Sequence, residues 1–284
     1  MILSASRRTD LPAWHIDWLL AGLRRGWVEI PNPFRPTQIS RISLRPEDVD
    51  AVFFWTRDIR PMLPHLDDPS VSQLRSVFLY TITGYGEPLE PRIPPWEVAT
   101  ASLRALSARV GPARVVWRYD PMILGDGLLS PASHRARFRD LARALEGATE
   151  RVVISLIDWY RKTERAMKPH LLGREPPGAQ RTGPVDPSLL DLIRDLRDTA
   201  TDHGIEAAGC CEPEWHERAL LPGGSCVDGE LLRRLWGLEV PGLRDPGQRK
   251  ACRCAPSRDI GRYDTCSGGC RYCYATLAPR NDCL

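Results

Sequence analysis

Short apolar runs that alternate with helical stretches constrain the fold of this chain more than any other feature. Six runs have the length and the β-branched or aromatic composition of buried strands. They are Ile2–Ser6, Ala51–Trp55, Val77–Thr83, Arg114–Tyr119, Val152–Ile157 and Ile205–Gly209. Strands that alternate with helices favour right-handed crossovers and a parallel sheet, so the sequence predicts the α/β class.

Four stretches between these runs predict helices. They are Pro12–Arg25, Pro95–Val110, Ser133–Leu145 and Pro187–His203, in the last of which the apolar residues recur at helical spacing. Six strand–helix repeats are fewer than a closed barrel needs, so we expect a partial (β/α)6 TIM-type barrel that binds ligands at the carboxyl ends of its strands. Residues 169–187, rich in proline and glycine, predict a loop that either covers this rim or merely connects.

The length of 284 residues suits one large domain. We expect residues 1–209 to form the barrel, and residues 210–284 to form a cysteine-rich extension packed on the barrel mouth within the same structural domain. The net charge of +3, from 39 basic and 36 acidic residues, does not indicate a dedicated nucleic-acid binder. Because no run of eighteen apolar residues occurs, we expect a cytoplasmic protein without a membrane partner.

All nine cysteines fall after residue 209. An odd count in a reducing compartment argues against a disulfide framework and favours metal ligation. The strongest motif is the CxxxCxxC pattern of Cys266, Cys270 and Cys273, in which Gly268 and Gly269 let the backbone pass close to a cluster. The spacing resembles the radical S-adenosylmethionine (SAM) motif, whose three cysteines leave one iron of a 4Fe-4S cluster open to SAM.

A structural zinc site or a closed cluster is the alternative for these cysteines. In that case Cys270 and Cys273 would be one half of the site, and Cys252 and Cys254 the other. If the CxxxCxxC loop holds its own cluster, Cys252 and Cys254 with Cys226 and either Cys210 or Cys211 would supply four thiolates for a second 4Fe-4S cluster. We favour Cys210 as the fourth ligand. Alternatively, Cys210 and Cys226 are small core residues, and we expect Cys283 to be unliganded.

Polar residues follow each predicted strand, at the rim where a ligand would bind. Each one alone could equally be a helix cap. The expected SAM- or anion-binding residues are Arg7, Arg8, Asp10, Arg57, Thr83, Arg161 and Glu212, because arginine binds carboxylates through paired hydrogen bonds. The expected catalytic residues, which would position substrate or move protons, are Arg118, Tyr119, Asp120 and Tyr160. The six histidines follow no metal-ligand spacing, so we expect each to be exposed or hydrogen bonded.

Several motifs resemble an uncharacterised bacterial family known as a domain of unknown function. They include residues 4–10 (SASRRTD), 32–34 (NPF), 54–57 (FWTR), 117–121 (WRYDP), 160–163 (YRKT), 259–261 (DIG), 263–266 (YDTC) and 273–275 (CYA). The cysteine segment alone is similar to radical SAM proteins of the spore photoproduct lyase and DNA photolyase-like group. That resemblance implies a six-stranded partial barrel, and a 5′-deoxyadenosyl radical formed when a reduced cluster cleaves SAM.

The position of the cysteine motif departs from that group, in which the motif follows the first strand. Here it follows the sixth predicted strand, near the end of the sequence. We therefore expect an oxygen-sensitive radical SAM enzyme with two clusters, acting on a small-molecule or macromolecular substrate and reduced by a donor such as flavodoxin or ferredoxin. The alternatives are a non-catalytic iron–sulfur or zinc protein, and a nucleic-acid repair or modification factor that would use Arg7 and Arg8.

Overall fold

A parallel eight-stranded sheet forms the centre of the computed structural model, which describes residues 1–170, 187–218, 220–240 and 244–276. The strand order is β10-β1-β4-β5-β6-β7-β8-β9. The six central strands occupy the six predicted runs, as β1 (Ile2–Ala5), β4 (Ala51–Thr56), β5 (Ser76–Thr81), β6 (Val115–Met122), β7 (Arg151–Leu156) and β8 (Glu206–Cys210). The α/β class is confirmed.

Two strands of two residues each extend the predicted sheet at its edges. β9 (Gly223–Gly224) pairs with β8, and β10 (Arg258–Asp259) pairs with β1. The sheet is open rather than closed into a barrel, since these two strands lie at opposite ends of the strand order. The segment expected to form an extension after residue 209 therefore supplies both edges of the sheet.

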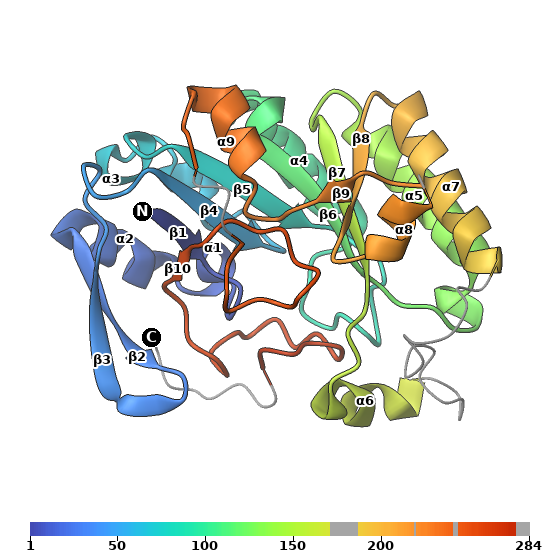
Figure 1. Ribbon diagram of the computed structural model, residues 1–284, viewed down its shortest axis with the longest axis horizontal. Helices are drawn as coiled ribbons and strands as arrows, with labels where there is room; N and C mark the ends of the chain where they lie inside the picture. The colour runs from blue at the N-terminus through green and yellow to red at the C-terminus, as the bar shows by residue number, and fades with distance from the viewer. Residues whose placement is uncertain (171–186, 219, 241–243, 277–284) are drawn as a thin grey trace.

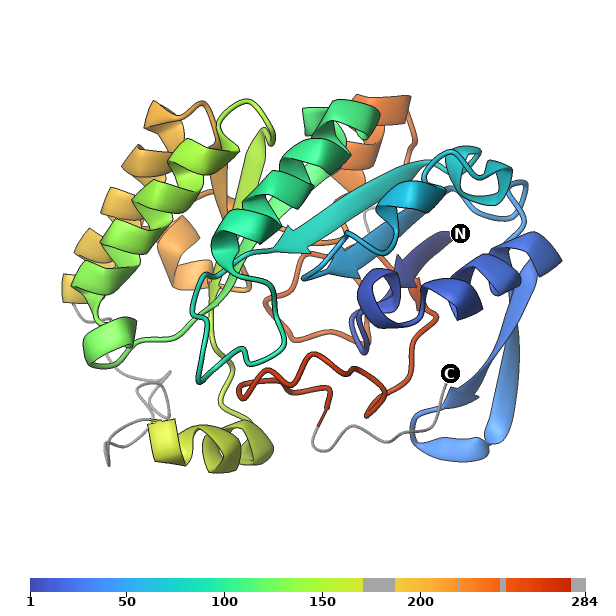
Figure 2. The same ribbon diagram turned by 180° about the vertical axis from the view of Figure 1, so that it is seen from behind.

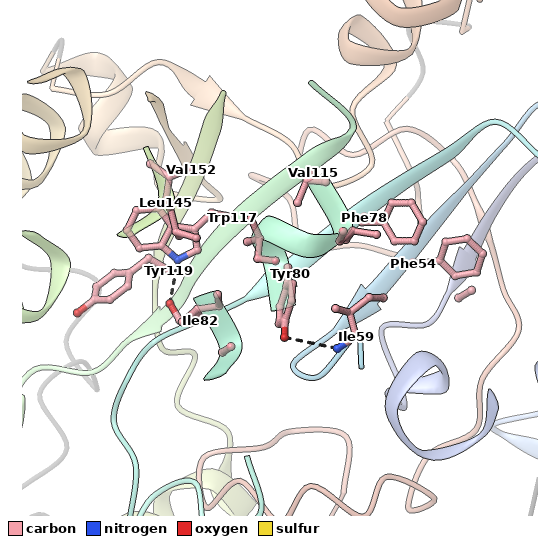
Figure 3. Packing of buried hydrophobic residues seen from close by; sticks show 14 of the residues in the cluster. Phe54, Ile59, Phe78, Tyr80, Ile82, Val115, Trp117, Tyr119, Leu145 and Val152 are labelled. Carbon is pink, nitrogen blue, oxygen red and sulfur yellow. Dashed lines mark hydrogen bonds between the residues drawn. The ribbon is translucent and has the colours of Figure 1, made fainter. Parts of the chain in front are cut away.

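Helices cover one face of the sheet (Figure 2). They are α1 (Leu11–Trp14), α2 (Ile16–Arg25), α3 (Pro69–Ser72), α4 (Trp96–Val110), α5 (Pro131–Leu145) and α7 (Pro187–Asp202). The strands present Phe54, Phe78, Trp117 and Tyr119 to them in one core (Figure 3), where the Trp117 ring nitrogen donates a 2.9 Å hydrogen bond to the Ile82 carbonyl. Alternate residues along a strand face opposite sides, so the neighbours of these residues point the other way.

The opposite face is covered by α9 (Gly229–Trp236) and by the irregular chain between α9 and the cysteine motif (Figure 1). A second core forms there, in which Phe53, Trp55, Leu79 and Val116 of the strands pack with α9. Five cysteines belong to this core: Cys210, Cys211, Cys226, Cys252 and Cys254. The cysteine-rich segment is therefore the second layer of the fold on this face.

Two features differ from the expected helices and strands. The expected helix Pro12–Arg25 is divided at His15, which has non-helical backbone angles and whose side-chain Nε2 lies 3.0 Å from the Thr265 carbonyl. An unexpected hairpin, β2 (Trp27–Asn32) and β3 (Arg35–Ser43), projects from the side of the molecule (Figure 1). Its strands contain two prolines, and most of β3 is exposed, so no apolar run marks it.

The remaining helices are short. They are α6 (Arg161–Met167) and α8 (Pro213–Glu217), with single 3-10 turns at Leu63–His65, Pro112–Arg114, Gly127–Leu129 and Lys168–His170. No described helix has the length and apolarity needed to span a membrane. Most of the expected loop 169–187, together with Cys283, lies outside the described residues.

Candidate functional site

The three motif cysteines lie on a loop, residues 260–276, which we call the cysteine loop. It leaves β10 and crosses the carboxyl ends of β1, β4 and β5 (Figure 1). The Ile260 amide donates to the Ser4 carbonyl over 3.0 Å, and the Arg271 amide donates to the Leu89 carbonyl over 2.9 Å. The loop therefore reaches the rim where the alternation of strands and helices predicts ligand binding.

Asp259 fastens the start of this loop to the end of β1. Its carboxylate accepts hydrogen bonds from the hydroxyls of Ser4 (2.9 Å) and Ser6 (2.6 Å), and from the amides of Arg7 (2.8 Å) and Gly261 (2.9 Å). Four donors on one carboxylate fix the position of β10 against β1. The cysteine motif is thereby tied to the first strand, although the two are far apart in sequence.

Small residues let the loop approach the strand ends so closely. A methyl group added at Gly261 would lie 2.1 Å from the Ser6 hydroxyl oxygen. Gly269 has a φ of +69°, in the left-handed region that glycine adopts without strain. The loop closes on itself, because the Asp264 amide donates to the Ala275 carbonyl over 3.0 Å. Its shape is set by these backbone contacts.

The three thiols of the loop lie close enough for their charges to interact. Burial raises the pKa of Cys266 to about 11, and it raises the pKa of Cys270 further. All three side chains are half-buried free thiols. Without a cation beside them, thiols in such a setting stay protonated.

Below Cys270 lies a buried ion pair. The Arg57 Nη1 atom is 2.5 Å from Glu90 Oε1, and the hydroxyls of Thr83 and Tyr272 donate to the same oxygen. Burial alone would raise the pKa of Glu90, but the Arg57 charge and these hydrogen bonds hold it below its ordinary value. Arg57 Nη2 is buried without a hydrogen-bond partner. The charge of the Arg57 guanidinium interacts with Cys270, so this unused donor fits an anionic group held by the loop.

Five further cysteines form a second group on the open face of the sheet, which we call the five-thiol group. It consists of Cys210, Cys211, Cys226, Cys252 and Cys254. The sulfurs of Cys210 and Cys226 are 3.7 Å apart. In the described part of the chain, no set of three or more His, Cys, Asp or Glu side chains surrounds a point that would hold a metal ion. The metal assignments therefore stay predictions.

Three arginines border the five-thiol group. The charges of Arg7, Arg118 and Arg249 each interact with two of its cysteines. Arg7 and Arg118 also face the Trp55 ring, with guanidinium carbons 5.2 and 4.6 Å from its centroid. Arg7 Nη2 and Arg118 Nε are buried without a hydrogen-bond partner. These unused donors beside soft thiol ligands fit a negatively charged metal–sulfur group.

Seven of the predicted rim residues lie in two places, on the cysteine side of the sheet and around the cysteine loop. Arg7, Arg118 and Asp120 lie on the cysteine side, where Arg118 pairs with Asp120 and donates to the Thr81 hydroxyl over 3.1 Å. Asp10, Arg57 and Thr83 lie around the cysteine loop, and burial raises the pKa of Asp10 to about 7. The Arg8 Nη1 atom donates to the Gly261 carbonyl over 3.3 Å.

Tyr119 requires a correction, because it lies on the helix face of the sheet. It is fully buried, and its hydroxyl donates to His134 Nδ1 over 2.7 Å. The structure therefore places it in the core, away from the cysteines. Tyr160 precedes α6 and lies near Tyr274, with ring centroids 6.0 Å apart, while Arg161 is exposed at the start of α6. Glu212 accepts a 3.0 Å hydrogen bond from the Leu156 amide.

Sequence reasoning missed four residues of this site. Glu90 carries no motif of its own, since its partners are distant in sequence, whereas Trp55 lies in the motif of residues 54–57 and could have been found. Asp259 could have been found, because the resemblance already singled out residues 259–261. Arg249 stands in a short basic stretch just before Cys252, which is a signal that basic side chains accompany the cysteines.

Residues 2–275 match a family that is described as a domain of unknown function, DUF1848. Among curated proteins, none matches the sequence. The match includes both the sheet and the cysteine loop as far as residue 275, so one family model spans the two. Because it covers nearly the whole sequence, the chain belongs to the DUF1848 family.

Proposed function

We propose that this protein is a radical SAM enzyme, with Cys266, Cys270 and Cys273 as the ligands of a 4Fe-4S cluster. The observation that carries the proposal is the place of the cysteine loop over the carboxyl ends of β1, β4 and β5. Such a cluster, when bound with SAM, supplies an electron that yields a 5′-deoxyadenosyl radical. In this proposal the open sheet acts as a partial barrel.

The unusual place of the motif in sequence is compatible with this proposal. Although the cysteine loop follows the last strand of the chain, that strand pairs with β1 in parallel register. The loop therefore leaves the sheet beside β1, which is where a loop that follows a first strand would leave it. The motif would lie beside the first strand of the sheet, as the radical SAM resemblance implies, although it comes late in the sequence.

The chain's own residues would bind and orient the reactants. Arg57 would donate from its free Nη2 to an anionic group next to Cys270, and the Glu90 pair would hold its guanidinium in place. Arg118 and Asp120, at the end of β6, would position substrate on the cysteine side of the sheet. Tyr160, at the start of α6, would handle a proton there. Flavodoxin or ferredoxin would supply the electron.

The test is an anaerobic preparation of the full chain, reconstituted with iron and sulfide and supplied with SAM and dithionite. Release of 5′-deoxyadenosine is expected, and the triple variant C266A/C270A/C273A should release none. Arg271→Ala is the matched control, because this exposed side chain lies between two of the cysteines. If the loop binds iron stoichiometrically but SAM is not cleaved, the proposed radical SAM activity is refuted. The protein would then be an iron–sulfur protein without this activity.

A further inference from the structure

The five-thiol group lies apart from the cysteine loop and is built from three segments of chain. Side-chain contacts link Cys210 to Cys211 and Cys226, and Cys252 to Cys211 and Cys254, and a further contact joins Cys226 to Cys254. These contacts form a closed ring of five thiols. All five side chains are buried, with at most 5% exposure.

The backbone is shaped to bring these thiols together. Cys210 ends β8, and Cys211 follows with a φ of 61°, in the left-handed region that is strained for a non-glycine residue. This turn directs two successive thiols into one group. The other segments are joined by the Ala255 amide, which donates to the Val227 carbonyl over 2.9 Å, and by the Val227 amide, which donates to Cys254 Sγ over 3.4 Å.

Charge distinguishes this group from an ordinary apolar core. Arg7 contacts the Cys254 thiol, Arg118 lies near Cys226 and Cys210, and Arg249 lies near Cys211. Buried guanidinium nitrogens of Arg7 and Arg118 have no hydrogen-bond partner. Leaving such donors unpaired beside neutral thiols is costly, whereas thiolates and sulfides would accept their hydrogen bonds.

A surface cavity of about 630 Å³ reaches Cys252. Acidic and basic side chains line it, among them Glu230, Glu239, Arg244 and Lys250. The five-thiol group is therefore reachable from outside by a route that does not pass the cysteine loop. Iron and sulfide could enter by this route.

We infer that the five-thiol group is a second iron–sulfur site, in which four of the five thiolates hold a 4Fe-4S cluster and the three arginines balance its negative charge. Two ferrous ions, two ferric ions and four sulfides combine with the four ligands without net electron transfer, and the ligands release their four thiol protons to solvent. The site does not depend on SAM chemistry at the cysteine loop. The group contains the three expected ligands Cys226, Cys252 and Cys254, together with both candidates for the fourth, Cys210 and Cys211.

The test uses the full-length variant C266A/C270A/C273A, which lacks the cysteine loop thiols. After anaerobic reconstitution it should retain about four iron and four sulfide per chain, roughly half the wild-type content, with the visible absorbance of such a cluster. Adding C252S/C254S should abolish it, while adding Arg253→Ala, an exposed position between those two cysteines, should not. Circular dichroism checks that each variant is folded.

Two results would overturn the inference. One is a folded triple variant that binds no iron. The other is one that binds a single zinc ion without sulfide. Both are independent of 5′-deoxyadenosine release by the wild-type protein, so failure of the second site and failure of the enzyme are told apart. If C252S/C254S does not fold, the iron and sulfide content of the triple variant alone decides.

Discussion

Tyr274 donates a hydrogen bond from its hydroxyl group to the backbone carbonyl of Arg7, over 2.9 Å. Tyr274 directly follows Cys273 of the cysteine loop, and the guanidinium of Arg7 contacts the Cys254 thiol of the five-thiol group. One residue at the end of β1 therefore touches both cysteine groups. Arg7 therefore links the cysteine loop to the separate five-thiol group.

Replacing Arg7 with methionine tests the electrostatic part of this link. The guanidinium beside Cys254 stabilises the more negative, reduced form of a bound cluster. In the C266A/C270A/C273A background, Arg7→Met should lower the reduction potential of the remaining cluster by tens of millivolts without changing its iron content. Potentiometric titration followed by electron paramagnetic resonance measures this shift, and Arg7→Lys should restore part of it.

Arg258→Met is the control for Arg7, since the Arg258 side chain is exposed on the neighbouring strand β10. It should leave the potential unchanged. Equal potentials in the Arg7→Met variant and its parent would show that Arg7 does not lie beside the cluster.

Removing the charge of Glu90 should destabilise the protein strongly. The Glu90→Gln variant leaves the Arg57 guanidinium buried without its carboxylate, and breaking a buried pair in this way costs about 3 kcal/mol or more. Urea denaturation of the two proteins measures the loss. The double variant Arg57→Met/Glu90→Gln should recover part of it, because no uncompensated charge remains.

Asp191→Asn is the matched comparison, because Asp191 pairs with Arg194 on the exposed surface of α7. It should change the free energy of unfolding by less than about 0.5 kcal/mol. If Glu90→Gln costs as little as Asp191→Asn, the buried pair does not hold Arg57 in place.

The close approach of the cysteine loop to β1 predicts that Gly261→Ala damages the loop. The added methyl would lie 2.1 Å from Ser6 Oγ and 2.6 Å from Ser6 Cβ, and the Ser6 hydroxyl is held by Asp259. We expect a loss of about 1–3 kcal/mol in stability and less iron in the loop, measured by thermal denaturation and iron analysis. In the control Gly247→Ala, the methyl would meet only Asp245 Oδ1, at 3.3 Å. Equal iron contents in the two variants would contradict the prediction.

The central sheet was predictable because buried parallel strands are continuous apolar runs. β9 and β10 were not, since Gly223–Gly224 and Arg258–Asp259 contain no apolar residue with a side chain to bury. The cysteine spacing predicted a compact loop but not its place, which depends on the pairing of β10 with β1. Four thiols of the five-thiol group were expected to lie together, but only because a second 4Fe-4S cluster needs four ligands. Tyr119 was predicted at the rim but lies in the core on the helix face, because a shift of one residue along a strand moves a side chain to the other face of the sheet.

His134 predicts a stability that depends on pH. It is fully buried, with Nε2 donating to the Ile123 carbonyl over 2.8 Å and Nδ1 accepting from Tyr119, so a proton on Nδ1 would replace the hydrogen bond that Tyr119 donates. Burial lowers its pKa to about 4, below the value of about 6.5 expected in the unfolded chain. The unfolded chain therefore binds more protons between these values.

It follows that the contribution of His134 to stability is complete above pH 6.5 and is lost as the pH falls toward 4. Between pH 7.5 and pH 5 this single group should cost the wild-type protein about 2 kcal/mol. His134→Gln, which keeps a donor and an acceptor but does not titrate, should be less stable than wild type at pH 7.5, and the difference should shrink at pH 5. Urea denaturation at both pH values measures it. A difference that stays constant between the two would mean that folding does not lower the pKa of His134.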